Sequence, residues 1–289
     1  MNFKNSFEEK LNEINNWISE LSPKGKGLHK IIYDSANYSV QAGGKRIRPM
    51  LAYAVCEMLG GNQNNVKHYA CAVEFIHTYS LIHDDLPCMD NDDLRRGMPT
   101  NHKKYGEAIA LLAGDSLLTY AFECASLSPN NPLTTIKAIN AISRASGISG
   151  MIGGQVIDIA GAKNYDELKT IHKMKTGALI RLSAYLGAIS ADCNELQLKA
   201  IDEFADNLGI AFQIKDDILD VESTTEELGK PVGSDDKRDL TTYATLFGIE
   251  GAKEKLALHT ELAKKALNIF GEKAEFLLWL ADMLLSRKN

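Results

Sequence analysis

Five aspartates and two arginines are crowded into the segment 84–96, and their side chains are suited to binding cations and anions. They are Asp84, Asp85, Asp90, Asp92 and Asp93, followed by Arg95 and Arg96. Hard divalent cations prefer carboxylate oxygens, and they keep water molecules that phosphate oxygens can replace. The segment therefore predicts a divalent cation site, with Mg²⁺ before Ca²⁺ or Mn²⁺, beside a phosphate-containing ligand.

A second acidic cluster lies late in the chain, in the sequence FQIKDDILD at 212–220. Asp216 and Asp220 are four residues apart and share a face of a helix, which is unfavourable unless a cation bridges them. Asp217 lies between them. Two such clusters, about 130 residues apart and both in apolar surroundings, predict a shared multi-metal site across the core of a helical bundle.

Basic residues that could hold an anion occur at three places outside the aspartate segments. Lys45 and Arg48 lie in GGKRIRP at 43–49, where a glycine pair lets the backbone approach a phosphate; the alternative is a helix start with surface cations. Lys175 begins the sequence KTG. Lys230 lies in a long polar loop that is a candidate lid.

The elements that must position these side chains are predicted to be helices. Apolar residues recur at helical spacing before Asp84, so a buried helix should end at the first acidic cluster. Carboxylates at that end oppose the helix dipole, which again favours a bound cation. Pro87 should break the helix and let Asp90 turn back toward Asp84.

The whole chain has the pattern of an all-α protein, because the two-residue alternation of strands is nearly absent. No linker divides it, so we expect one domain over 1–289. The predicted helices span 4–20, 28–41, 47–60, 64–86, 107–127, 132–146, 149–160, 165–189, 194–220, 239–267 and 272–287. Their short connections favour antiparallel neighbours in a bundle.

Composition limits the class of protein. The net charge is −6, which implies no general attraction to nucleic acid. The five cysteines are odd in number and lack CxxC spacing, as expected of reduced thiols in a cytoplasmic protein. The first residues form a charged amphipathic pattern rather than a signal segment, and no apolar run is long enough to predict a membrane span. There is no GxxxxGK[ST], GxGxxG or HExxH sequence.

With these features in place, the sequence resembles the trans-type isoprenyl diphosphate synthases, most closely their bacterial farnesyl-forming members. Besides GGKRIRP and FQIKDDILD, the resemblance rests on DDLPCMD at 84–90, DDLRRGMPTNH at 92–102, LAGDSLL at 112–118, GGQVID at 153–158, KTG at 175–177 and GKPVGSD at 229–235. It implies an all-α isoprenoid-synthase bundle with a deep central cavity, usually a homodimer. The implied reaction condenses isopentenyl diphosphate with dimethylallyl and geranyl diphosphate to give farnesyl diphosphate.

The resemblance also implies roles for individual residues. The Mg²⁺ ions, three per active site with Mn²⁺ as a possible substitute, are bound by Asp84, Asp90 and Asp216, assisted by Asp85, Asp217 and Asp220. The allylic diphosphate is held by Arg95, Lys175 and Lys230. Isopentenyl diphosphate is held by Lys45, Arg48, His77 and Arg96. The side chains of Thr176 and Gln213 face the developing cation and, with Lys175, form the catalytic set.

Product length is expected to depend on the residues five and four before the first aspartate, Tyr79 and Ser80. A bulky tyrosine at this floor of the cavity favours a C15 product, although the DDLPCMDNDD segment keeps a C20 geranylgeranyl product open. His83 is interpreted as a structural residue.

Other interpretations explain less of the sequence. His83-Asp84 matches the HD pair of helical metal phosphohydrolases, which accounts for neither Lys45 and Arg48 nor the second cluster. A terpene cyclase typically has an Asn/Asp-Ser/Thr-Glu triplet at the second cluster, and a di-iron bundle needs two ExxH sequences, whereas only Glu74 to His77 fits. A catalytically silent partner subunit should lack motif aspartates.

Overall fold

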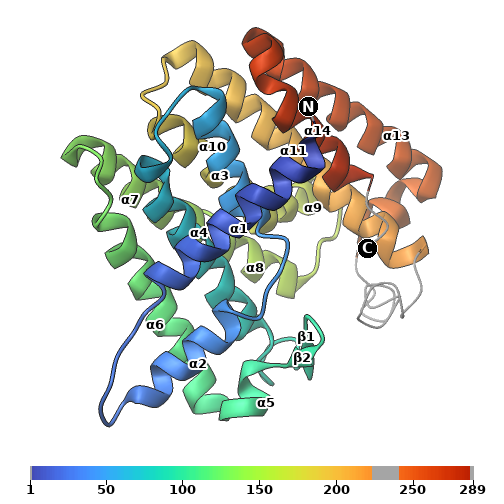
Figure 1. Ribbon diagram of the computed structural model, residues 1–289. Coiled ribbons are helices and arrows are strands. Elements are labelled where there is room, and N and C mark those ends of the chain that lie inside the picture. The colour runs from blue at the N-terminus through green and yellow to red at the C-terminus, as the bar shows by residue number, and fades with distance from the viewer. Residues whose placement is uncertain (1, 223–240, 287–289) are drawn as a thin grey trace.

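The computed structural model describes residues 2–222 and 241–286 (Figure 1). Its first half contains α1 (Phe3–Leu21), α2 (Lys30–Val40), α3 (Ile47–Met58), α4 (Gln63–Asp84), β1 (Leu94–Arg95), β2 (Met98–Pro99), α5 (Asn101–Tyr105) and α6 (Glu107–Ser126). Its second half contains α7 (Pro132–Ser146), α8 (Met151–Ala160), α9 (Tyr165–His172), η1 (Lys173–Gly177), α10 (Ala178–Ile189), α11 (Glu195–Glu222), α13 (Tyr243–Ala266), η3 (Leu267–Ala274) and α14 (Glu275–Leu285). The all-α prediction is confirmed.

Two local features depart from the predicted helices. The antiparallel hairpin of β1 and β2 and the short helix α5 lie between α4 and α6, and neither was predicted. The single helix predicted over 165–189 is interrupted by η1, a π-helical turn at Lys173–Gly177. A π-turn inserts a residue into the helical ladder, which hydrophobic periodicity does not reveal. Lys230 lies outside the described residues.

Polar caps fix where several helices begin. The side chains of Asn62, Asn131 and Asn164 accept hydrogen bonds from backbone N–H groups in the first turns of α4, α7 and α9. Thr242 and Thr245 form a reciprocal capping box at the start of α13. These caps satisfy amide donors that have no partner within the helix, so they fix where each helix begins, including α4, which carries Asp84.

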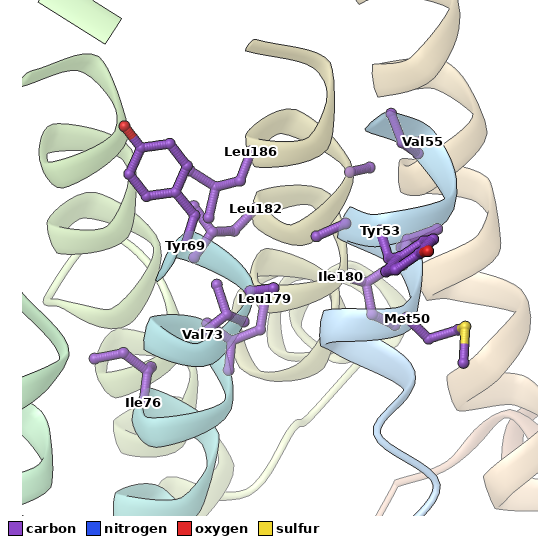
Figure 2. Packing of buried hydrophobic residues seen from close by; sticks show 14 of the residues in the cluster. Met50, Tyr53, Val55, Tyr69, Val73, Ile76, Leu179, Ile180, Leu182 and Leu186 are labelled. Carbon is purple, nitrogen blue, oxygen red and sulfur yellow. The ribbon is translucent and has the colours of Figure 1, made fainter. Parts of the chain in front are cut away.

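The main core is formed where α3, α4 and α10 pack together (Figure 2). The residues labelled in Figure 2 come from these three helices: Met50, Tyr53, Val55, Tyr69, Val73, Ile76, Leu179, Ile180, Leu182 and Leu186. Gly187 allows close contact between α10 and α3, since a Cβ there would stand 2.4 Å from the carbonyl oxygen of Ala52. The helix that ends at Asp84 is therefore held by buried apolar side chains along most of its length.

A smaller apolar cluster joins α9, α11 and α13 around Tyr243. The imidazole of His172 stacks on the Tyr243 ring with a centroid distance of 5.5 Å and an interplanar angle of 22°. The backbone N–H of Tyr243 donates to Asp217 Oδ2 over 2.8 Å. This cluster therefore fixes the C-terminal half of α11, where the second aspartate cluster lies.

Helix α6 is the only helix in the described part of the chain that is long and apolar enough to cross a membrane. It packs against α4, and also against α2, α5 and α7, through residues such as Ala113, Gly114 and Leu117. These contacts are those of a bundle helix. All five cysteines are free thiols, as the sequence analysis expected.

Candidate active site

A cavity of about 570 Å³ opens between α4, α6, α8 and the η1–α10 segment. Predicted site residues that line it are Arg48, His77, Tyr79, Ser80, Asp84, Lys175 and Thr176. The remaining wall is mostly apolar, with Leu118, Met151 and Leu179 among its residues. The structure thus brings residues predicted for both diphosphates and for product length to one hydrocarbon-lined space.

Asp84 lies at the C-terminal end of α4 on the wall of this cavity. The chain turns back after Pro87, and the N–H of Asp90 donates to the carbonyl oxygen of Asp84 over 2.9 Å, so the predicted bend is present. Burial raises the pKa of the Asp84 carboxyl to about 6; the Lys175 ammonium lowers it, and the Asp90 carboxylate raises it. A divalent cation between the Asp84 and Asp90 carboxylates would offset both the cost of burying the Asp84 charge and the repulsion between the two charges.

Asp85 is buried and its carboxylate is engaged by Arg95. Arg95 Nε donates to Asp85 Oδ1 over 2.9 Å, and a terminal guanidinium nitrogen of Arg95 also contacts Asp92. Burial raises the pKa of Asp85, and the hydrogen bond from Arg95 opposes this shift. The contact suits Asp85 to orienting Arg95 at the start of the hairpin.

Arg96 is turned toward the glycine pair by the tight turn of the hairpin. Arg96 and Gly97 have φ values of 54° and 75°, and the guanidinium of Arg96 donates to the carbonyl oxygen of Gly43. Gly44 has a φ of 122°, a conformation that favours glycine, and it lies against the end of the Arg96 side chain. The hairpin therefore places the Arg96 guanidinium beside the GGKRIRP segment, in which Lys45 is exposed.

Four arginines surround His77. Burial lowers the pKa of the imidazole well below its usual value, and the charges of Arg48, Arg96, Arg95 and Arg46 lower it further. Arg48 Nε is buried and has no hydrogen-bond partner among the described residues. His77 is thus a neutral imidazole beside concentrated positive charge, which fits an anion site.

Arg46 anchors this cationic segment although no role was predicted for it. Its guanidinium donates to Glu74 Oε1 over 2.7 Å and to the Val40 carbonyl oxygen over 2.6 Å, and Nε donates to Asn15 Oδ1 over 3.2 Å. The Arg46 and Glu74 side chains are each 2% exposed. Its place between two cations in GGKRIRP was the only sequence signal for this role.

Lys175 is placed by the π-turn and by close packing of α8. Its Nζ donates to Asp158 Oδ2 over 2.5 Å. A Cβ on Gly154 would stand 2.5 Å from the backbone nitrogen of Lys175, so the glycines of GGQVID let α8 approach η1. Asp158 was not predicted as a site residue, although it is the single acidic residue of an otherwise apolar helix.

The second cluster lies on α11 and is not part of the cavity lining among the described residues. Burial lowers the pKa of the cavity residue Arg48, and the Asp216 carboxylate opposes this shift. The charges of Arg48 and Asp216 therefore interact. Asp217 is buried and accepts the N–H of Tyr243, as a carboxylate at a helix start should. Asp220 is buried, and Gln213 is half-buried on the same helix.

The donor set fits a hard divalent cation in chemistry, because Asp84 and Asp90 offer oxygen ligands whose negative charges repel each other. Within residues 2–222 and 241–286, however, no group of three or more histidine, cysteine, aspartate or glutamate side chains is close enough to hold an ion.

Tyr79, 4% exposed, lines the cavity one turn before His83, with Ser80 beside it. Burial raises the pKa of the Tyr79 phenol to about 12, and the Asp84 charge adds to the shift. The Tyr79 ring meets the His83 ring edge-to-face at 5.7 Å. Tyr79 therefore presents an uncharged bulky side chain to the cavity, as expected of a residue that limits chain length.

Comparisons with known proteins identify the family. The polyprenyl synthetase family model matches residues 29–275. The farnesyl diphosphate synthase of Geobacillus stearothermophilus is 46% identical over 258 residues, which cover 87% of each chain. The chloroplastic geranylgeranyl pyrophosphate synthase of Capsicum annuum is 47% identical over 295 residues, covering 100% of this chain and 79% of that protein.

Solved structures agree in fold. An FPP/GFPP synthase from Zymomonas mobilis, solved without ligand, superposes with a TM-score of 0.88 at 32% identity, covering 99% of both chains. The family model, the relatives and the solved structure thus agree over most of the chain, and the family model spans both aspartate segments. The chain belongs to the polyprenyl synthetase family and is a transferase of the trans-isoprenyl diphosphate synthase class.

Proposed function

We propose that this enzyme condenses isopentenyl diphosphate with dimethylallyl diphosphate and then with geranyl diphosphate, giving (2E,6E)-farnesyl diphosphate. The observation that carries the proposal is the cavity itself. Its wall is mostly hydrocarbon, and Asp84, Lys175, Arg48, His77 and Tyr79 all line it.

Each substrate has a set of cationic residues suited to it. Lys45, Arg48 and Arg96, around neutral His77, hold isopentenyl diphosphate. Arg95 and Lys175, with Lys230 outside the described residues, hold the allylic diphosphate. Within the allylic set, Asp85 and Asp158 orient Arg95 and Lys175 before substrate binds.

The reaction begins when the allylic C–O bond breaks and its electron pair leaves with the diphosphate. Lys175 and Arg95 stabilise the growing negative charge, while the apolar wall excludes water from the allylic cation. Oxygen atoms of Thr176 and Gln213 face that cation without attacking it. The double bond of isopentenyl diphosphate then attacks that cation and forms the new C–C bond, which leaves a new cation on the isopentenyl unit. An adjacent C–H bond breaks, its electron pair forms the new double bond, and departing pyrophosphate accepts the proton.

Divalent cations complete the proposed site. Asp84, Asp90 and Asp216 would bind up to three Mg²⁺ ions, for which Mn²⁺ is a possible substitute, and Asp220 would assist. The ions would supply charge neutralisation for the leaving diphosphate. Asp217 would assist by fixing α11 against the start of α13 rather than by donating both oxygens to a metal.

Labelled isopentenyl diphosphate, Mg²⁺ and either dimethylallyl or geranyl diphosphate test the proposal. We expect label in a C15 product with either starter, and no product after chelation of the metal. Phosphate release without chain elongation would refute the transferase mechanism. A dominant C20 product would favour the alternative, a geranylgeranyl diphosphate synthase, which is supported by the similarity to plant enzymes of that name.

We also propose that the chain is a single cytoplasmic domain over 1–289 that acts as a homodimer, without nucleic-acid partners. The support for a dimer is an exposed cavity wall. Leu111, Ile152, Val156 and Ile159 line the cavity, yet they are 42–68% exposed. A second copy packed on this surface, which we call the α6–α8 wall, would close the cavity against water.

A further inference from the structure

His83 lies in the cavity wall and has no part in the proposed metal or diphosphate binding. It lies on α4 four residues after Tyr79, and both rings line the cavity. Their centroids are 5.7 Å apart with an interplanar angle of 78°, an edge-to-face contact. Such pairs have a preferred geometry, so the position of one ring restricts the other.

The opposite side of the His83 ring is held by α6. Nε2 of His83 lies 3.0 Å from the carbonyl oxygen of Leu111 and 3.8 Å from Oδ1 of Asp115. A Cβ built on Gly114 would stand 2.1 Å from Nε2 and 2.4 Å from Cδ2. The glycine of LAGDSLL therefore leaves the space that the imidazole occupies.

Within the part of the chain that the structure describes, no hydrogen bond holds the Tyr79 ring in place. Its hydroxyl is buried and has no hydrogen-bond partner among the described residues. The ring is 4% exposed, so its orientation depends on the side chains packed around it. The His83 ring contacts the Tyr79 ring edge-to-face, and His83 in turn is held by its contact with Leu111 on α6.

We propose that His83 and Gly114 are specificity-determining positioning residues, which hold the Tyr79 ring across the cavity and thereby set the length of the prenyl product. The proposal rests on the proposed synthase function and deepens it. The lack of a side chain at Gly114 lets the His83 imidazole pack closely against α6, and the imidazole supports the Tyr79 ring. Tyr79 then meets the end of the growing prenyl chain. Product length is thus decided by contact between two helices as well as by the tyrosine.

The test is the product distribution of variants made with the same substrates. His83→Gln retains a hydrogen-bonding group but loses the ring, and His83→Ala loses both. We expect either change to raise the C20 to C15 ratio by about tenfold, since freeing space for a few methylene groups alters discrimination by that order. Gly114→Ala should push the imidazole into the cavity and increase the share of C10 product.

The double variant His83→Ala/Gly114→Ala separates this mechanism from general damage. Because the added methyl group has no ring to displace, we expect the product distribution of His83→Ala alone, a non-additive result. Gly187→Ala is the matched control: it crowds the α3–α10 contact away from the cavity. It should lower thermal stability and leave the product ratio unchanged.

The outcomes distinguish this inference from the proposed function. If Tyr79→Ala lengthens the product whereas the His83 and Gly114 variants retain the wild-type ratio, the positioning role is wrong and the synthase function stands. Additive effects in the double variant would equally overturn it. If the wild-type protein forms no prenyl product, the proposed function fails and the inference fails with it.

Discussion

The properties of individual side chains explain why the site needs partners that the motifs alone do not reveal. Asp85 and Asp217 belong to the aspartate motifs, yet their carboxylates contact Arg95 and the N–H of Tyr243 respectively. Asp84, in contrast, is half-buried, and its desolvation together with the charges of Asp90 and Asp85 raises its pKa to about 6, against the charge of Lys175. Aspartates that look alike in sequence are therefore suited to different tasks.

At this scale the clearest prediction concerns Tyr79. Tyr79→Ala removes the ring from the cavity and leaves space for at least one further isoprene unit, so the main product should shift from C15 to C20 or longer. Chromatography of dephosphorylated products measures the shift. Unchanged C15 output would remove Tyr79 from the control of chain length.

At the scale of elements, the loop before α3 depends on a buried ion pair that spans several helices. Arg46 adopts a left-handed conformation with a φ of 48° and ties this loop to α1, α2 and α4. Buried pairs are costly to break because the remaining charge has no partner. The pair therefore couples the position of Lys45 and Arg48 to the packing of the bundle.

Arg46→Met should lower the free energy of unfolding by about 3–5 kcal/mol, because it leaves Glu74 buried and unpaired. The double variant Arg46→Met/Glu74→Leu should recover most of that stability. The KM for isopentenyl diphosphate should remain raised by about tenfold in both, since the loop has lost its anchor. Chemical denaturation and steady-state kinetics measure the two effects.

Lys10→Met is the matched control for this prediction. It removes the ion pair in which Lys10 Nζ lies 2.7 Å from Glu57 Oε1. This pair does not contact the loop that carries Lys45 and Arg48. It should change stability without changing the KM. If the double variant recovers both stability and KM, the anchoring role of Arg46 is wrong.

His172 gives the contact between α9 and α13 a defined pH dependence. Burial lowers the pKa of its imidazole to about 4. The Asp158 charge opposes this shift, and the Lys175 charge adds to it. Below pH 6.5 the unfolded chain binds a proton that the folded protein excludes, so the free energy of unfolding falls as the pH drops toward 4. The full loss is about 3 kcal/mol from this residue.

His172→Phe keeps an aromatic ring against Tyr243 but carries no titrating group. The free energy of unfolding of this variant should therefore depend less steeply on pH between about 6.5 and 4. Urea denaturation at several pH values measures the slope. An identical slope in the wild-type protein and the variant would contradict the depressed pKa.

The sequence predicted most helices because apolar side chains on α1, α4, α7 and α11 recur at helical spacing. The bend after Pro87 was also predicted, because a proline cannot continue an unperturbed helix. The π-turn at Lys173–Gly177 and the hairpin before Thr100 were not, because their geometry depends on contacts with distant segments. Gly154 packs on the π-turn, and the guanidinium of Arg96 in the hairpin donates to the carbonyl oxygen of Gly43.

At the scale of the whole molecule, the α6–α8 wall predicts a self-association surface. Val156→Glu places a charge on a side chain that is 63% exposed in the single chain. Sedimentation velocity should find a dimer for the wild-type protein and a monomer for the variant. Leu196→Glu, on α11 and 66% exposed, is the control that should remain dimeric. A monomeric wild-type protein would refute the dimer.

In the whole molecule, charge interactions connect both acidic helix segments to residues that line one cavity. Asp84 interacts with the charge of Lys175, Asp216 with that of Arg48, and these two cations line the same space. The central claim is that both aspartates act together on one leaving diphosphate. This cooperation is a property of the complete bundle, because α4 and α11 are far apart in sequence.

A double-mutant cycle on turnover tests this claim most directly. Asp84→Asn and Asp216→Asn should each lower kcat by about a thousandfold or more with helicity retained, and the double variant should be scarcely slower than either. The contradictory result is substantial activity in one single variant, or effects that multiply in the double variant. Either would mean that the two aspartate clusters do not serve the same reaction centre.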